Sequence, residues 1–117
     1  MEQKREDIKD ILCKAIIKTQ LIRFYYESSG GKYFRKVEPY LLGIKHNGNI
    51  YFTGYEYPSS ERVKKRDNDR QGHYLLNKID PSKFEVLNET FGGIKIPEER
   101  IFGELRTVKV ICRIKKK

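Results

Sequence analysis

Apolar residues recur at a three- to four-residue spacing near the start of the chain, and this spacing gives way to alternation further on. The first pattern predicts an amphipathic helix over about residues 5–18. Its apolar stripe consists of Ile8, Ile11, Leu12, Ala15 and Ile16. A helix this short is not stable alone in water, so we expect the stripe to pack on the segment that follows.

Alternation begins at about residue 20 and predicts β-strands. In residues 21–28, one face of the predicted strand carries Ile22, Phe24 and Tyr26, and the other carries Arg23, Tyr25 and Glu27. A second strand is predicted over about residues 33–45, where Pro39 indicates an edge position, a bulge or a break. The Asn-Gly pair at 47–48 then predicts a hairpin with a type I′ turn.

The third predicted strand, residues 48–57, contains four aromatic residues in ten positions. Alternation places Ile50, Phe52 and Gly54 on one face and Tyr51, Thr53, Tyr55 and Tyr57 on the other. Tyrosine suits a surface that is partly wet and also makes contacts, because an apolar ring carries a polar hydroxyl. The row therefore indicates either a binding face or a second sheet face that is covered by phenol rings.

The remaining chain predicts a long polar loop over residues 58–72, a strand over 73–79 and a final strand over 107–114. Residues 83–91 fit either a strand or a short helix, and residues 97–100 fit a helical turn. The fold class is therefore mainly β with one N-terminal helix. Five or six short antiparallel strands of this kind usually close into a small barrel.

Composition and charge agree with a single folded domain over residues 1–117, with the barrel at about 20–90 and the C-terminal strand at about 105–115. The chain has 25 Lys and Arg against 16 Asp and Glu, which gives a net charge of +9. This charge attracts polyanions, but it also fits a merely solubilising surface. No run approaches the length of a membrane span, so no membrane partner is expected.

The cysteines and histidines are few and far apart in the sequence. Cys13 and Cys112 are the only cysteines, and His46 and His73 the only histidines, so neither a zinc site nor a cofactor is expected. Because no signal-like apolar segment follows a basic start, we expect a cytoplasmic protein with reduced thiols.

Five short motifs, taken together, resemble the WYL domain, a small Sm-like β-barrel named after a Trp-Tyr-Leu triplet. In chain order they are Ala15 and Ile16; Ile22, Phe24 and Tyr26; Arg35, Val37, Pro39 and Leu42; Ile50, Tyr51, Phe52, Gly54 and Tyr55; and Tyr74, Leu76, Lys78 and Ile79. The resemblance covers roughly residues 11–90. It implies a domain that senses a ligand in transcription regulators, or one that binds nucleic acid beside helicases and CRISPR effectors. At this length we expect a stand-alone version of the domain.

The sequence departs from the family pattern at several positions. Ile50 and Phe52 replace the Trp and Leu of the triplet, and Gly72 and Lys78 stand where relatives often have arginine. If those arginines hold an anionic ligand in relatives, this chain binds it differently or less well, because lysine lacks the planar fork of arginine. His73 or the arginines of the polar loop would then substitute.

The combined pattern predicts a non-enzymatic regulatory or accessory domain that binds single-stranded DNA or RNA through a basic, tyrosine-bearing face. The candidate binding residues are Tyr26, Arg35, Tyr51, Tyr55, Tyr57, Arg62, Lys64, Lys65, Arg66, His73 and Lys78. Arg35 and Lys36 point to opposite faces, and Arg35 is expected to join the tyrosines because it matches the family motif. The alternative for Arg35 is a buried ion pair with Glu27 or Glu38. The alternative for the loop cations is a solvated run of charge.

Three other functions stay open from the sequence. The same face can form a pocket for a small, nucleotide-like anion whose binding is passed to a partner protein, or it can be a dimer or hetero-complex interface. Enzymatic motifs are absent: the Gly-Gly-Lys at 30–32 lacks the Walker spacing, and no nucleophile–base pair is indicated. A base-dependent ribonuclease using His73, Tyr74 and Lys78 is the remaining enzymatic hypothesis.

Overall fold

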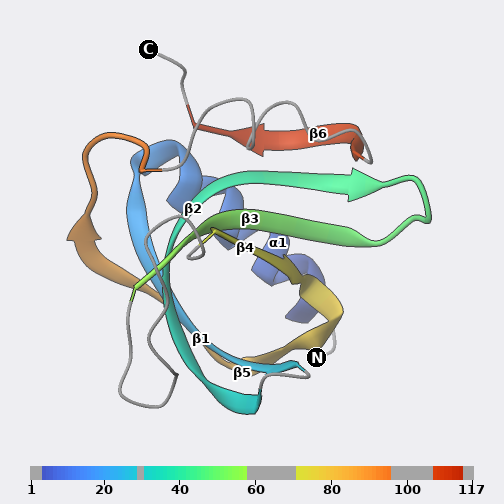
Figure 1. Ribbon diagram of the computed structural model, residues 1–117, viewed down its shortest axis with the longest axis horizontal. Coiled ribbons are helices and arrows are strands. Elements are labelled where there is room, and N and C mark those ends of the chain that lie inside the picture. The colour runs from blue at the N-terminus through green and yellow to red at the C-terminus, as the bar shows by residue number, and fades with distance from the viewer. Residues whose placement is uncertain (1–3, 29–30, 58–70, 96–106, 115–117) are drawn as a thin grey trace.

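The computed structural model describes residues 4–28, 31–57, 71–95 and 107–114 (Figure 1). Predictions for the polar loop from residue 58 to 70 and for the turn at 97–100 lie outside these ranges. The elements are α1 (Lys4–Lys18), β1 (Gln20–Ser28), β2 (Gly31–Lys45), β3 (Ile50–Glu56), β4 (Gln71–Leu75), the 3₁₀ turn η2 (Leu76–Lys78), β5 (Ile79–Thr90) and β6 (Thr107–Arg113). The expected N-terminal helix, followed by antiparallel strands, is confirmed within these ranges.

The long strand β2 organises the sheet. The strand order is β4-β3-β2-β1-β5, and β6 also pairs with β2. Along β2 the neighbours change, because its first half pairs with β1 and its second half pairs with β3 and β6. The register with β3 shifts between Pro39 and Leu41, so a bulge, one of the three alternatives that Pro39 indicated, is present. Opposite Pro39, a side chain at Gly54 would overlap the carbonyl oxygen of Glu38, so the two strands need glycine there.

The sheet curls strongly without closing. Strands β4 and β5 lie at opposite ends of the hydrogen-bonded order, yet the three-residue turn η2 joins them directly. Figure 1 shows the resulting curl, in which β1 and β5 curve away from β3 and β4. Among the described strands no ladder pairs β4 with β5, so closure into a barrel is not confirmed. The single strand predicted over 73–79 is wrong, because the chain turns at Leu76, which is buried, and starts a new strand.

The β2–β3 hairpin forms where predicted, but its turn is of another type. The amide of Gly48 donates to the carbonyl of Lys45 at 2.8 Å, and only Gly48, with φ of 88°, has the left-handed conformation in this turn. A type I′ turn would need Asn47 in that region as well. Instead the Asn47 side chain accepts a hydrogen bond from the amide of Asn49 at 3.0 Å, and Gly48 takes the left-handed position of a bulge that ends the turn.

Helix α1 packs across β1, β2, β5 and β6 and covers one side of the sheet. Four of its predicted core residues, Ile8, Leu12, Ala15 and Ile16, are buried. The fifth, Ile11, is 41% exposed, because it lies at the edge of the apolar stripe. Inside the curl the rings of Phe24, Phe52 and Tyr74 lie 5.0–5.5 Å apart and fill the space.

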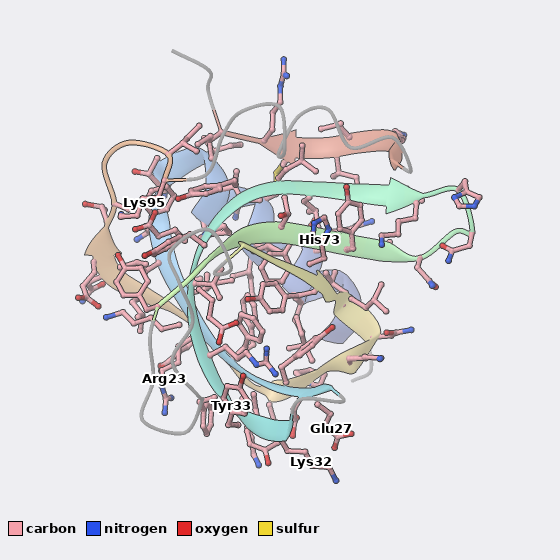
Figure 2. All side chains as sticks on the ribbon, viewed as in Figure 1. Arg23, Glu27, Lys32, Tyr33, His73 and Lys95 are labelled. Atoms are coloured by element: carbon pink, nitrogen blue, oxygen red, sulfur yellow. A yellow bond between two sulfur atoms is a disulfide. The ribbon has the colours of Figure 1, made fainter. Side chains whose placement is uncertain are left out.

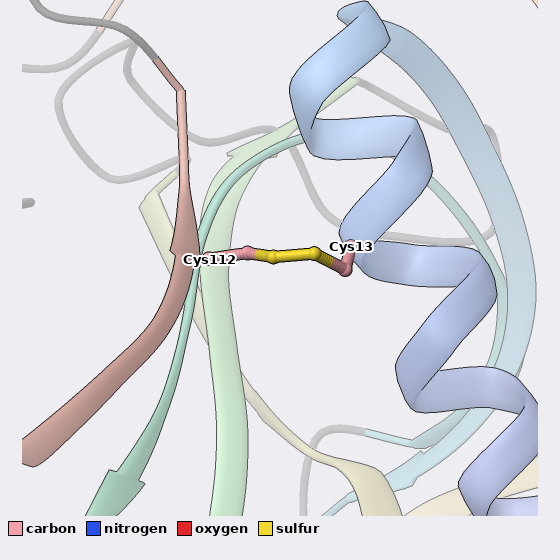
Figure 3. The surroundings of a disulfide bond; sticks show 2 residues. All are labelled: Cys13 and Cys112. Atoms are coloured by element: carbon pink, nitrogen blue, oxygen red, sulfur yellow. A yellow bond between two sulfur atoms is a disulfide. The ribbon is translucent and has the colours of Figure 1, made fainter.

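A disulfide joins Cys13 on α1 to Cys112 on β6, with Cα atoms 5.6 Å apart (Figure 3). The expectation of two reduced thiols is therefore wrong. The two cysteines are 99 positions apart in the sequence, and only the packing of the helix against the last strand brings them together. The bond ties the ends of the described chain across the fold.

Candidate functional site

The three tyrosines of the predicted row, Tyr51, Tyr55 and Tyr57, differ in their exposure to solvent. Tyr51 is fully buried, because β4 pairs alongside it and the ring of His73 stacks on it at 5.9 Å with an angle of 10° between the planes. The ammonium of Lys45 lies 5.0 Å from the centre of the same ring. The expectation that Tyr51 faces a ligand together with the later tyrosines is therefore corrected: at this end of β3 the outer face is part of the core.

Tyr55 and Tyr57, at the other end, stay half-buried. Their ring centres are 5.8 Å apart in an edge-to-face arrangement. The ammonium of Lys95 lies 5.5 Å from the Tyr55 ring and 5.9 Å from the Tyr57 ring, and that of Lys36 lies 5.3 Å from the Tyr57 ring. We call these four residues the tyrosine–lysine face.

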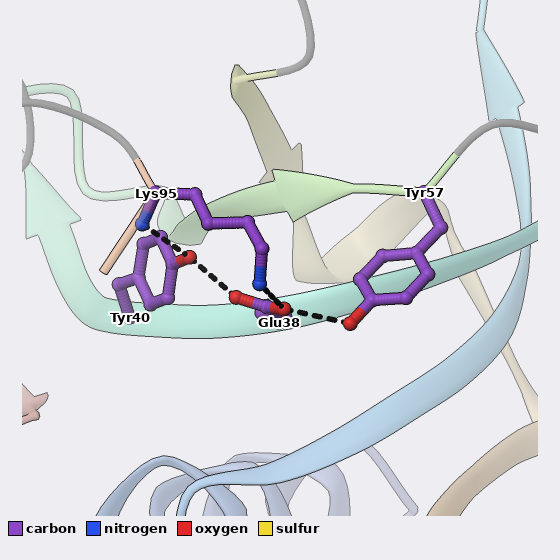
Figure 4. Close-up of polar contacts among 4 residues, drawn as sticks. All are labelled: Glu38, Tyr40, Tyr57 and Lys95. Atoms are coloured by element: carbon purple, nitrogen blue, oxygen red, sulfur yellow. Dashed lines mark hydrogen bonds and ion pairs between the residues drawn. The ribbon is translucent and has the colours of Figure 1, made fainter. Parts of the chain in front are cut away.

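A buried carboxylate lies under this face. Glu38 is fully buried and accepts hydrogen bonds from the hydroxyls of Tyr40 at 2.6 Å and Tyr57 at 2.7 Å. Lys95 also donates to Glu38 through its ammonium, and to the Tyr40 hydroxyl through its backbone amide (Figure 4). Among the described residues, the donors to this carboxylate are two tyrosine hydroxyls and the ammonium of Lys95. The hydrogen bond to Glu38 orients the Tyr57 ring.

Both phenols that bind Glu38 stay protonated over the ordinary pH range. Burial, and then the hydrogen bond to Glu38, raises the pKa of Tyr57 well above the usual tyrosine value. The same two causes raise the pKa of Tyr40 further. Both hydroxyls therefore remain hydrogen-bond donors to the carboxylate.

Arg35 lies on the other face of the sheet. Its guanidinium is 3.4 Å from Glu56, and both side chains are less than 10% exposed. It also lies 4.1 Å from the centre of the Tyr33 ring and 5.1 Å from that of Tyr26. The prediction that Arg35 joins the tyrosine row is wrong: its neighbour Lys36 does so instead. The alternative, that Arg35 forms a buried ion pair, is confirmed. The predicted partner is wrong, because it is Glu56 and not Glu27 or Glu38.

The inner cluster also explains one departure from the family pattern. The Tyr74 hydroxyl donates to Glu56 at 2.7 Å, and any side chain at Gly72 would overlap the Tyr74 ring. An arginine at this position would therefore displace Tyr74. Tyr26, a candidate binding residue, is buried in the same region and its hydroxyl accepts the amide of Leu75 at 3.0 Å.

Two further candidates within the described residues, His73 and Lys78, do not join the tyrosine–lysine face. His73 is exposed but lies on Tyr51, and Lys78 is exposed on η2. Arg62, Lys64, Lys65 and Arg66 lie outside the described residues. The sequence prediction missed Lys36, Glu38 and Lys95. Strand alternation gives Lys36 and Glu38 the same face, so this pair was detectable, whereas Lys95 follows Gly92 and Gly93 with no local signal.

The described part of the chain contains neither a candidate metal site nor a candidate membrane-spanning helix. No group of three or more His, Cys, Asp or Glu residues there is placed to hold a metal ion. None of the helices there is long and apolar enough to cross a membrane.

Comparison with known proteins gives the family. A search of curated proteins found no match. Among solved structures the fold is similar to proteasome accessory factor B/C (PafBC) of Arthrobacter aurescens, with a TM-score of 0.57 and 24% sequence identity. That match covers 78% of this chain but only 13% of the other, so it shows the likeness of the fold alone. The sequence model of the WYL domain matches residues 7–80, which is more than half of the chain. The chain therefore belongs to the WYL domain family.

Proposed function

We propose that this protein is a non-enzymatic regulatory or accessory domain that binds single-stranded nucleic acid through the tyrosine–lysine face. The observation that carries the proposal is the pair of half-buried rings, Tyr55 and Tyr57, with two lysine ammonium groups 5.3–5.9 Å from the ring centres. Aromatic rings at a surface stack on bases, at about 1–3 kcal/mol per base. Lysines beside them neutralise phosphates. Membership of the WYL family supports a regulatory setting, including the regulation of transcription.

The ion pairs on this face leave its cations able to bind phosphate. Lys36 pairs with Glu89 at 2.9 Å, but the side chains are 35% and 59% exposed, and such pairs contribute only about 0–1 kcal/mol. A phosphate can therefore compete with Glu89. Lys95 keeps donors beyond the one that Glu38 accepts, because an ammonium has three. The net charge of +9 also favours the approach of a polyanion.

An open strand fits this face better than an enclosed small anion. The lysine side chains that flank the rings are 35% and 46% exposed, so they border a surface rather than line a closed cavity. Arg35, the cation that would anchor a ligand inside the curl, is instead held against Glu56 and is covered by the rings of Tyr26 and Tyr33. A strand of nucleic acid can lie along the outer face without disturbing that interior.

A fluorescence anisotropy titration with labelled single-stranded DNA and RNA oligomers tests the proposal. We expect Tyr57→Ala to lose about 1–3 kcal/mol of binding free energy, because the stacking ring is removed. Tyr57→Phe is the matched control, since it keeps the ring and loses only the hydroxyl. Affinity should also fall steeply with salt. Failure of the wild-type protein to bind any oligomer at low salt would end the proposal.

A further inference from the structure

A second cluster of rings and cations lies on the outer face of β1 and β2, where the sequence indicated no site. Tyr25 and Phe34 are directly opposite each other on the two strands, with ring centres 5.2 Å apart. The Arg23 guanidinium lies 3.9 Å from the centre of the Phe34 ring, and the Lys83 ammonium lies 4.7 Å from that of Tyr25. Both rings are half-buried and both cations are exposed.

A bulge of β5 turns this cluster into a pocket. Between two pairs of the β1–β5 ladder, β1 advances from Phe24 to Tyr26 while β5 runs from Phe84 to Ile79, so residues 80–83 project from the ladder. Asp80 stabilises this projecting segment, because its side chain accepts two hydrogen bonds from Ser82. The Ser82 amide donates at 3.0 Å and the Ser82 hydroxyl at 2.8 Å. Strand β5 is at the end of the strand order, and Lys83 belongs to the projecting residues and lies over the Tyr25 ring. The resulting pocket of about 340 Å³ is lined by Arg23, Phe34, Ser82, Lys83, Phe84 and Glu85.

The pocket adjoins the tyrosine–lysine face. Arg23 and Lys36 are paired positions across β1 and β2, and the Lys36 ammonium lies over the Tyr57 ring. In Figure 2, Arg23 and Lys95 lie on the same side of the molecule. A ligand that extends from Tyr57 past Lys36 therefore reaches Arg23 next.

We propose that this pocket is a phosphate subsite for the same single strand, contacted by Lys83 and by the guanidinium fork of Arg23; this inference rests on the proposed function. Lys83 has no carboxylate partner among the residues described. Arg23 pairs with Glu85 at 3.4 Å, but the two side chains are 44% and 55% exposed, so a phosphate can replace the carboxylate. Stacking on Phe34 orients the guanidinium, and its planar donors suit a phosphate.

Anisotropy titrations of Lys83→Ala, Arg23→Lys and Lys14→Ala with labelled oligothymidylate test this subsite. Lys14 is exposed on α1, so its replacement is the matched control for the loss of one positive charge. We expect Lys83→Ala to weaken binding roughly five- to tenfold at 0.1 M salt and to lower the salt slope by about one, while Lys14→Ala changes neither. Arg23→Lys should weaken binding less, because the charge remains and only the fork is lost.

The outcomes separate the two proposals. If Lys83→Ala behaves like Lys14→Ala while Tyr57→Ala still weakens binding, the subsite is wrong and the tyrosine–lysine face stands. If the wild-type protein binds no oligomer at low salt, both are wrong. A thermal-shift measurement on each variant confirms that it is folded.

Discussion

Two buried glutamates on opposite faces of one sheet are satisfied in different ways. Glu56, on the inner face, is bonded to Arg35 and to the Tyr74 hydroxyl, and the side chains of the ion pair are only 5% and 8% exposed. Glu38, on the outer face, is fully buried. Its cation, however, is Lys95, whose side chain is 46% exposed.

This difference shows that the exposure of the paired cation decides the role of a buried carboxylate. A buried cation limits the carboxylate to stabilising the fold, whereas an exposed cation links it to the protein surface. A buried charge is tolerated only when donors surround it. Around Glu56 the donors among the described residues, Arg35 and the Tyr74 hydroxyl, are buried, so these contacts stabilise the fold. Around Glu38 they include Tyr57 and Lys95, which also form the tyrosine–lysine face. A ligand on that face therefore touches the residues that keep Glu38 satisfied.

The inner cluster should be the more costly to break. We expect Glu56→Ala to lower the free energy of unfolding by about 3–5 kcal/mol, because it removes the carboxylate that compensates a buried guanidinium. Urea denaturation measures this. The control is Glu85→Ala, which breaks the exposed pair with Arg23 and should cost about 1 kcal/mol or less. Equal losses in the two variants would show that the inner pair is not sealed from water.

The outer cluster should be weakened less by loss of its cation. Lys95→Met keeps most of the aliphatic stem and removes the ammonium, so Glu38 retains the two tyrosine hydroxyls. We expect a loss of about 1–3 kcal/mol in the same denaturation experiment, since a buried acceptor loses one donor. We also expect weaker oligomer binding. A variant that loses as much stability as Glu56→Ala would mean that the two clusters do not differ as described.

The smallest effect concerns a single hydroxyl. Tyr57→Phe should lower the free energy of unfolding by about 1 kcal/mol at neutral pH. Because the pKa of Tyr57 is raised in the folded protein, the native state keeps a proton that the unfolded chain loses above the ordinary tyrosine value of about 10. The contribution of Tyr57 to the stability of the wild-type protein is therefore independent of pH below that value and falls above it.

Denaturation of both proteins between about pH 8 and pH 11 measures the difference, and the fall should be shallower in Tyr57→Phe. Parallel curves for the wild type and the variant would contradict the proposed bond between Tyr57 and Glu38. The other titrating groups are common to both proteins, so they cancel in the comparison.

Much of the local structure could be predicted from the sequence. Which side chains belong to the candidate site could not be predicted. The buried stripe of α1 and the alternation of β1 follow from helical and strand geometry, and the bulge at Pro39 follows from its missing amide proton. Alternation also says that Arg35 and Lys36 face opposite sides. It does not say which side is enclosed, because the sheet buries residues on both of its faces.

The sequence by itself determined the fold class, the family and the position of the hairpin, since these depend on patterns within a few neighbouring residues. Only the tertiary structure decided that Tyr51 is core while Tyr57 meets the surface, that Lys95 reaches Glu38, and that Cys13 meets Cys112. The physical reason is that each of these contacts depends on how far the sheet curls and on which element covers which face. Those quantities are set by the packing of segments distant in the chain, and no local pattern encodes them.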